Sequence, residues 1–283
     1  MSATSLKGKA RRILIYGVVI GFCIFSAFPF LVMAITTFKA DRDLYRPKNN
    51  PFFYNDPPTL DNLRLLFLET NYTGFVWNSF VVGVLVVMIT LIIAIPAAYS
   101  LARLVGSWGE RAGIGMFLVY LVPPTLLFIP LFRMVVAFGL NDSIWSLVLV
   151  YPTISIPFST WLLMGFFKSI PPDLEEAAMV DGYSRFTAFL KVVMPLSLSG
   201  VIAVTVFTFT LTLHEFIYAL SFISASDQRT ISVGVPVELI RGDVFFWQSL
   251  LAAAFIVAIP VGIVYTFFLD KLVEGFTAGA IKG

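Results

Sequence analysis

The chain has 283 residues, of which 58% are hydrophobic and 13% are charged, and its mean hydropathy is +0.90. A fold surrounded by water could not bury so much apolar surface, so the composition predicts a polytopic membrane protein. The net charge of +2 is too small to indicate nucleic-acid binding. The single cysteine, Cys23, excludes an intramolecular disulfide, and with only one histidine the chain is a poor candidate for a zinc site.

Several apolar runs are long enough to cross a bilayer, which takes roughly 20 residues. They lie at about residues 13–37, 75–102, 112–137, 143–167, 198–222 and 248–269. The expected fold class is therefore an all-α membrane protein with six transmembrane helices over residues 13–270, and this places residues 1–12 and 271–283 on one side. That side is predicted to be cytoplasmic, because a basic cluster precedes the first span: Lys7, Lys9, Arg11 and Arg12.

Two loops on the other side are long enough to hold structure of their own. The first, at about 38–74, contains four prolines and the run Phe52-Phe53-Tyr54, which predicts an ordered segment near the membrane interface. The second covers about 223–247. Each loop either meets a soluble partner or covers the helix bundle, and the sequence leaves both interpretations open.

Prolines interrupt two of the expected spans. The third span contains Pro123, Pro124 and Pro130, and the fourth contains Pro152 and Pro157. Because proline removes a backbone donor, we expect these helices to be bent. Bends suit a cavity that opens and closes, and they also occur as simple packing irregularities in large bundles.

A polar stretch at Ser169–Pro195 separates the fourth and fifth spans and predicts two short helices. Pro171 and Pro172 suit the first turn of a helix, and the acidic residues that follow suit its positive end. Gly182 is expected to end this helix, and Ser184 to cap the next. Both helices are too short to span, so the stretch lies at the membrane surface or against a partner; an ordinary amphipathic loop is the alternative.

The run Glu176-Ala177-Ala178, followed by Asp181-Gly182 and by Pro195, resembles the EAA signature of ABC importer permeases. The flanking run Gly165–Pro171 and Phe189 resemble the carbohydrate-uptake branch of that family. The resemblance extends from the second span to the last residue. It implies that residues 169–195 form a cytoplasmic two-helix EAA coupling loop in a bacterial inner-membrane protein, with both termini cytoplasmic.

The resemblance also implies partners and site residues. The loop would sit in a cleft of a cytoplasmic ATP-binding subunit dimer, through the coupling residues Glu175, Glu176, Ala177, Ala178, Asp181, Gly182, Phe189 and Pro195. A second, different permease chain would complete the complex, and an extracytoplasmic solute-binding protein would deliver a sugar-like substrate. ATP and Mg²⁺ would be bound by the partner ATPase and no cofactor by this chain.

Two ionisable residues, His214 and Glu215, fall within the fifth expected span. Because such residues are costly at membrane depth, they are candidates for the translocation path, with an interfacial or helix-anchoring role as the alternative. Related permeases would carry an Asn-Glu-Phe-like run here, so His214 departs from the pattern.

The glycine-rich C-terminus resembles the tail of the maltose permease subgroup, which reaches the ATPase dimer. Thr277 and Lys282 are the candidates for that contact, and a frayed terminus is the alternative. No phosphate-binding loop, nucleophile elbow or catalytic constellation is recognisable, so the chain is expected not to be an enzyme. The alternative function is an ATP-independent channel or carrier for a small polar solute, gated by the same loop.

Overall fold

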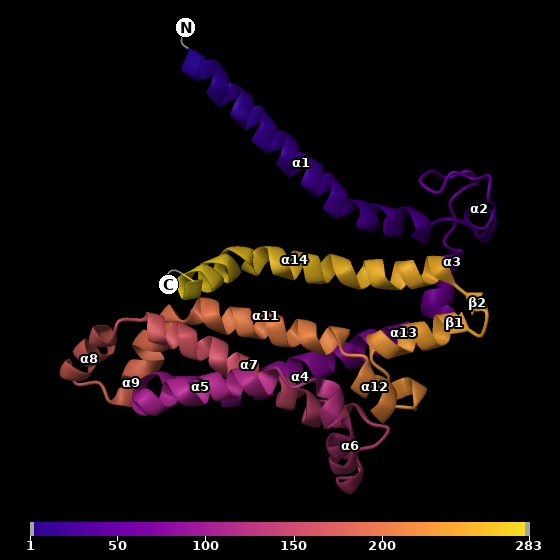
Figure 1. Cartoon of the computed structure of the whole chain (residues 1–283). Helices are drawn as coiled ribbons and strands as arrows, with labels where there is room; N and C mark the ends of the chain where they lie inside the picture. The colour runs from indigo at the N-terminus through magenta and orange to yellow at the C-terminus, as the bar shows by residue number, and fades with distance from the viewer. Residues whose placement is uncertain (1–2, 281–283) are drawn as a thin grey trace. The chain divides into compact units, whose positions relative to one another are not determined.

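The computed structural model describes the backbone of residues 3–280 and the side chains of residues 11–269. The chain divides into two compact units, of which one contains the residues up to Thr70 together with Glu238–Pro260, and the other Asn71–Val237 together with the chain from Val261 onward. Figure 1 labels the elements. Four described helices are long and apolar enough to span a membrane, and six spans result if each of two bent helix pairs counts as one. This agrees with the expected all-α membrane fold.

The first unit begins with the long helix α1 and is completed by a later hairpin and helix. Its elements are α1 (Ala3–Thr37), α2 (Asp41–Leu44), α3 (Asp61–Arg64), the π-helical turn η1 (Leu65–Glu69), β1 (Ile240–Arg241), β2 (Val244–Phe245) and the first part of α14 (Trp247–Ala280). β1 and β2 pair antiparallel, with Ile240 opposite Phe245. The sequence did not predict this hairpin, because each strand is only two residues long.

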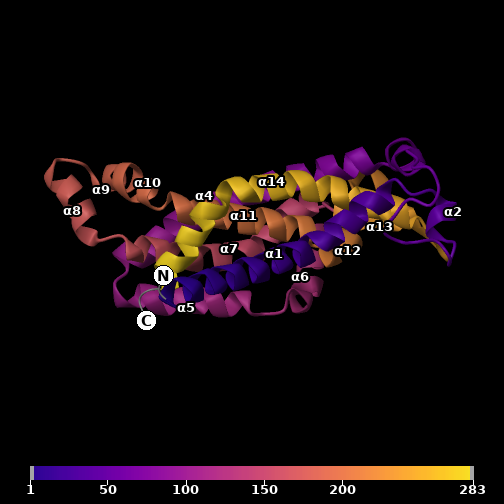
Figure 2. The ribbon, with the colours of Figure 1, turned by 90° about the horizontal axis from the view of Figure 1, so that it is seen from above.

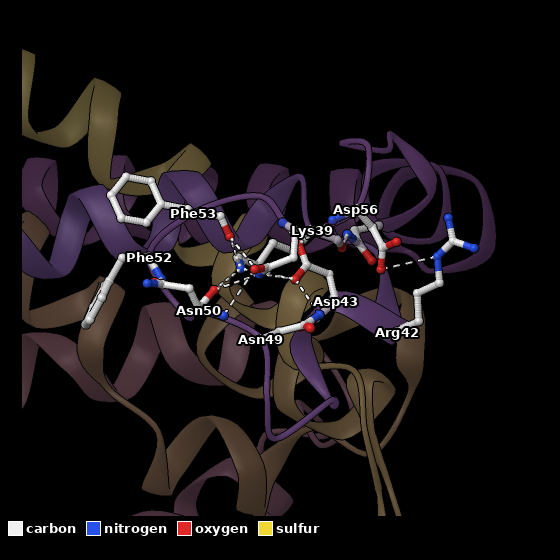
Figure 3. Close-up of polar contacts among 10 residues, drawn as sticks. Lys39, Arg42, Asp43, Asn49, Asn50, Phe52, Phe53 and Asp56 are labelled. Atoms are coloured by element: carbon white, nitrogen blue, oxygen red, sulfur yellow. Dashed lines mark hydrogen bonds and ion pairs between the residues drawn. The ribbon is translucent and has the colours of Figure 1, made fainter.

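The loop after α1 is ordered around a buried ion pair between Lys39 and Asp43, whose charged atoms lie 3.5 Å apart (Figure 3). The Lys39 ammonium donates hydrogen bonds to the carbonyls of Asn50 and Phe53, at 3.0 and 2.6 Å. Burial opposes the ionisation of Asp43, but hydrogen bonds from the Asn55 side chain and backbone, with Lys39 nearby, outweigh it and lower its pKa to about 2. The loop is therefore ordered, as its proline and aromatic content predicted.

The second unit is a helical bundle. Its elements are α4 (Tyr72–Tyr99), η2 (Ser100–Leu104), α5 (Ser107–Tyr120), η3 (Pro124–Leu127), α6 (Phe128–Ala137), α7 (Ile144–Ser169), α8 (Pro172–Val180), α9 (Arg185–Ala188), η4 (Phe189–Val193), α10 (Met194–Leu196), α11 (Leu198–His214), α12 (Ile217–Phe222), η5 (Ser226–Gln228) and α13 (Ile231–Leu239), whose last two residues belong to the first unit. In Figures 1 and 2, α8 and α9 project beyond one end of the bundle formed by α4, α5, α7 and α11, and α6 and α12 lie toward the other end.

Two of the predicted spans are broken. Residues 112–137 were expected as one helix, but α5 ends at Tyr120 and the chain turns by 85° before continuing from Pro124. Consecutive prolines at 123 and 124 explain the break, since neither supplies a backbone donor. The predicted span 198–222 is wrong at its end, because α11 stops at His214 and α12 starts at Ile217. By contrast, α7 runs as one helix through Pro152 and Pro157.

We predict that Lys39→Met will open the loop at residues 40–58. The substitution leaves the buried carboxylate of Asp43 without its counter-ion, a loss of about 3–5 kcal/mol, and two backbone carbonyls with one donor fewer each. The measurement is the rate at which an added protease cleaves this loop in membrane-embedded protein, which follows the population of the open loop. Lys48→Met is the matched control, because Lys48 is exposed. Equal cleavage rates in the two variants would contradict the structural role of the pair.

Candidate functional site

The first helix of the 169–195 segment, α8, forms as the sequence predicts. It starts at Pro172, with Pro171 in the N-cap position and Asp173 and Glu175 in its first turn. Gly182 follows its end with a φ of +94°, a left-handed conformation that favours glycine. The amide of Gly182 donates to the carbonyl of Met179 and that of Tyr183 to the carbonyl of Ala178, both at 3.1 Å. These two bonds are the Schellman pattern of a helix C-terminus.

The second helix is continuous from Arg185 to Leu196 but changes its winding along the way. Ser184 caps it, because its hydroxyl accepts a hydrogen bond from the amide of Thr187 at 3.2 Å. The five residues from Phe189 to Val193 are π-helical, and α10 follows. The chain then turns by 72° into α11, one residue beyond the end of α10. Pro195 therefore lies just before the bend that it was expected to mark.

The segment has two faces, and the predicted coupling residues divide between them. Those on the exposed side are Glu176, Ala177, Asp181, Gly182 and Pro195. Those on the buried side are Glu175, Ala178 and Phe189. The apolar residues of the second helix are divided in the same way, because Phe189 and Val193 are buried whereas Phe186 and Leu190 are exposed.

Glu175 is buried against the end of α4. Its carboxylate accepts a hydrogen bond from the hydroxyl of Tyr99, and its Oε2 lies 3.7 Å from Nε of Arg103. Arg103 also donates from Nη2 to the carbonyl of Ile170, the residue that follows the end of α7, at 2.5 Å. One arginine therefore connects the ends of α4, α7 and α8.

Aromatic rings complete this contact. The ring of Tyr99 lies 4.4 Å from that of Phe189 and 6.1 Å from that of Phe167, measured between centroids. All three belong to one hydrophobic cluster that also includes Ala98, Leu163 and Val204. The sequence identified neither Tyr99 nor Arg103 as a site residue. The one signal present was their spacing, since residues four apart share a helix face.

Glu215 lies at the break between α11 and α12, and its contacts are those of a helix cap. Its carboxylate oxygens accept from the amides of Tyr218 and Ala219 at 2.9 and 3.1 Å, and from the hydroxyl of Tyr151 at 2.8 Å. The positive end of the α12 dipole and these three donors stabilise the charge. This arrangement favours the helix-anchoring alternative for Glu215.

His214 is exposed, and its Nδ1 lies 2.9 Å from the carbonyl oxygen of Thr210. The structure does not bring His214 or Glu215 near the 169–195 segment, because they end α11 whereas the segment leads into its start at Leu198. A helix of this length spans about 25 Å. Of the two tail candidates, Thr277 lies in α14, whose helix continues to Ala280, and Lys282 lies outside the described residues.

Comparison with known proteins identifies a family pattern over most of the chain. A family model described as the binding-protein-dependent transport system inner membrane component matches residues 94–277. The sulfoquinovosyl glycerol transport system permease protein SmoH of Agrobacterium fabrum is 36% identical over 258 residues, covering 90% of this chain and 89% of that protein. The trehalose/maltose transport system permease protein MalG of Thermococcus litoralis is 31% identical over 283 residues, covering 96% and 97%.

A solved structure has the same fold. It belongs to a bacterial ABC transporter involved in the import of the acidic polysaccharide alginate, and it matches with a TM-score of 0.77 at 16% identity, covering 96% of this chain and 99% of that one. At this identity the match concerns the fold alone.

We predict that Gly182→Ala will destabilise the 169–195 segment by about 1–2 kcal/mol. No atom lies within 4 Å of the position that a Cβ would take, so the cost comes from the left-handed backbone and not from a clash. Gly165→Ala is the control, because Gly165 is helical, has equally open surroundings and gains helix propensity. Hydrogen exchange of residues 172–196 is expected to accelerate in the first variant only. Equal exchange in both would show that the turn does not need its glycine.

Proposed function

Because the chain belongs to the family of binding-protein-dependent transport system inner membrane components, as a permease subunit of an ABC importer, we propose that its 169–195 segment couples it to an ATPase. In this proposal a cytoplasmic ATP-binding subunit dimer receives the segment in a cleft. ATP-driven closure of the dimer then moves the segment, and the bundle opens and closes the path for the solute.

The observation that carries this proposal is an exposed face on helices that project beyond the bundle (Figures 1 and 2). This docking face consists of Leu174, Glu176, Val180, Asp181, Tyr183 and Phe186. Val180 and Phe186 are 87% and 69% exposed, although both are strongly apolar. Exposed apolar side chains and carboxylates on one short projecting segment are typical of a protein interface.

The energy for transport is proposed to come from the partner ATPase. Since the chain carries no recognisable phosphate-binding loop, ATP and Mg²⁺ are assigned to the partner ATPase, and this chain is a non-catalytic subunit without a cofactor. Within the side chains that the structure describes, no three His, Cys, Asp or Glu residues gather as a metal site would require.

A sugar or sugar derivative is the proposed substrate. The names of the relatives support this class, because one is a sulfoquinovosyl glycerol permease and another a trehalose/maltose permease. We assign the rest of the path to a second, different permease chain and the delivery of the solute to an extracytoplasmic binding protein. His214 and Glu215 remain candidates for the path, and Thr277 and Lys282 for contacts with the ATPase.

The proposed topology places the docking face in the cytoplasm of a bacterial cell. Residues 1–12 and 271–283 then lie on the same side, with the spans of residues 13–270 in the inner membrane. The basic residues before the first span support this orientation.

We predict that Glu176→Ala will weaken association with the ATPase about tenfold, the effect of losing about 1.4 kcal/mol at an interface. The chain, tagged and extracted in mild detergent from its own host, is expected to bring down an ATP-binding subunit, and the variant much less of it. Membrane insertion should be unchanged, because Glu176 is exposed.

The control for this experiment is Glu110→Ala, which removes an exposed carboxylate from α5. It should retain the ATPase. If the unmodified chain brings down no ATP-binding subunit, the importer proposal fails and an ATP-independent channel or carrier takes its place.

We also predict that a green fluorescent protein fused after Gly283 will fluoresce, because it folds in the cytoplasm. The matched fusion carries the same reporter in the loop at residues 40–58, which the proposed topology places outside, and it should stay dark. If only the loop fusion fluoresces, the proposed orientation is wrong and the C-terminus lies outside the cytoplasm.

A further inference from the structure

The 169–195 segment is connected covalently to only two helices of the bundle. α8 follows α7 through Ile170 and Pro171, and the second helix leads into α11 through Ser197. α4 is far away in the sequence, yet its end contacts the segment through Tyr99 and Arg103. A motion of the segment can therefore reach α4 directly through these side chains.

The contact is polar, buried and shared among several elements. The side chains of Arg103 and Glu175 are 11% and 7% exposed, so water screens their attraction little. Arg103 also holds the carbonyl of Ile170, and the hydroxyl of Tyr99 donates to the other carboxylate oxygen of Glu175. The network joins the ends of three helices through one ion pair and two hydrogen bonds, so sliding of α8 against α4 would break several of these contacts at once.

Irregular helix winding occurs on both sides of this contact. The π-helical turn η2 starts directly after Tyr99 and contains Arg103, and the π-helical turn η4 starts at Phe189, whose ring lies against Tyr99. Single π-helical turns within α-helices are often found at functional sites. Here each turn sets the direction of side chains that meet at the same point.

Two adjacent carboxylates have different surroundings. Glu176 is exposed on the docking face, whereas Glu175 points into the molecule and is satisfied by Tyr99 and Arg103. Glu176 is therefore available for a partner, whereas Glu175 attaches α8 to the bundle.

We propose that Tyr99, Arg103 and Glu175 form a joint that makes α8 and the end of α4 move together, so that a push on the docking face enters the bundle through α4. The three are positioning residues for coupling. This inference rests on the proposed function, since it needs an ATPase to supply the push.

The test measures whether nucleotide binding to the ATPase changes the spectrum of a spin label at the opposite end of α4. A spin label is placed at Trp77, which is 63% exposed and about 33 Å along the helix from Tyr99, after Cys23 is replaced by serine. A second label is placed at Trp145, which is 54% exposed near the start of α7. The complex purified with its own ATPase is measured with and without Mg²⁺ and a non-hydrolysable ATP analogue.

In the unmodified joint, the analogue is expected to change the spectrum at both labels. Arg103→Met should reduce the change at Trp77 about fivefold or more, as expected for the loss of a coupling interaction. The change at Trp145 should persist, because α7 is covalently connected to α8. Tyr99→Phe, which removes only a hydroxyl, should act in the same direction, and Arg111→Met, which removes an exposed arginine on α5, should change neither label.

Each other result decides against a specific claim. A Trp77 label that never responds, or that responds equally in Arg103→Met, overturns the joint and leaves the proposed function intact. Loss of the whole complex in both Arg103→Met and Tyr99→Phe also overturns it, because the residues would then serve assembly. Purification without any ATPase overturns the proposed function and the joint together.

Discussion

The arrangement of the 169–195 segment depends on a single buried carboxylate. Glu175 is held by the hydroxyl of Tyr99 and the guanidinium of Arg103, while Arg103 also binds the carbonyl of Ile170, just after the end of α7. An uncompensated charge at this depth would be strongly destabilising, so the three helix ends have to stay together for the charge to be satisfied. The position of α8 relative to the bundle is therefore set by an electrostatic requirement as well as by apolar packing.

Because one face of the segment is occupied in this way, the other face is free for a partner. The Schellman turn at Gly182 satisfies backbone groups at the end of α8, and the Ser184 cap does so at the start of the second helix, without help from outside. The exposed face is thus formed before a partner binds. A surface that is already ordered loses less entropy on binding and transmits a displacement with less deformation.

The helix breaks elsewhere follow the same rule, that polar groups within a membrane protein must be satisfied internally. After Tyr120 the chain turns where two prolines supply no donors, and after His214 it turns where the Glu215 carboxylate caps α12. The sequence placed a continuous span across each break, because hydropathy records the apolar character of side chains and not the direction of the backbone. Both breaks lie toward the end of the bundle away from α8, where α6 and α12 are seen in Figure 1.

The sequence by itself determined the membrane class, the approximate span positions, and the two short helices of the 169–195 segment, including the turn at Gly182 and the cap at Ser184. These features follow from local composition and from backbone preferences, which act over a few residues. Only the tertiary structure decided which of the two neighbouring glutamates faces inward, and that Tyr99 and Arg103 receive it. Those contacts join residues more than seventy positions apart, and no local pattern specifies which distant donors a buried charge will find.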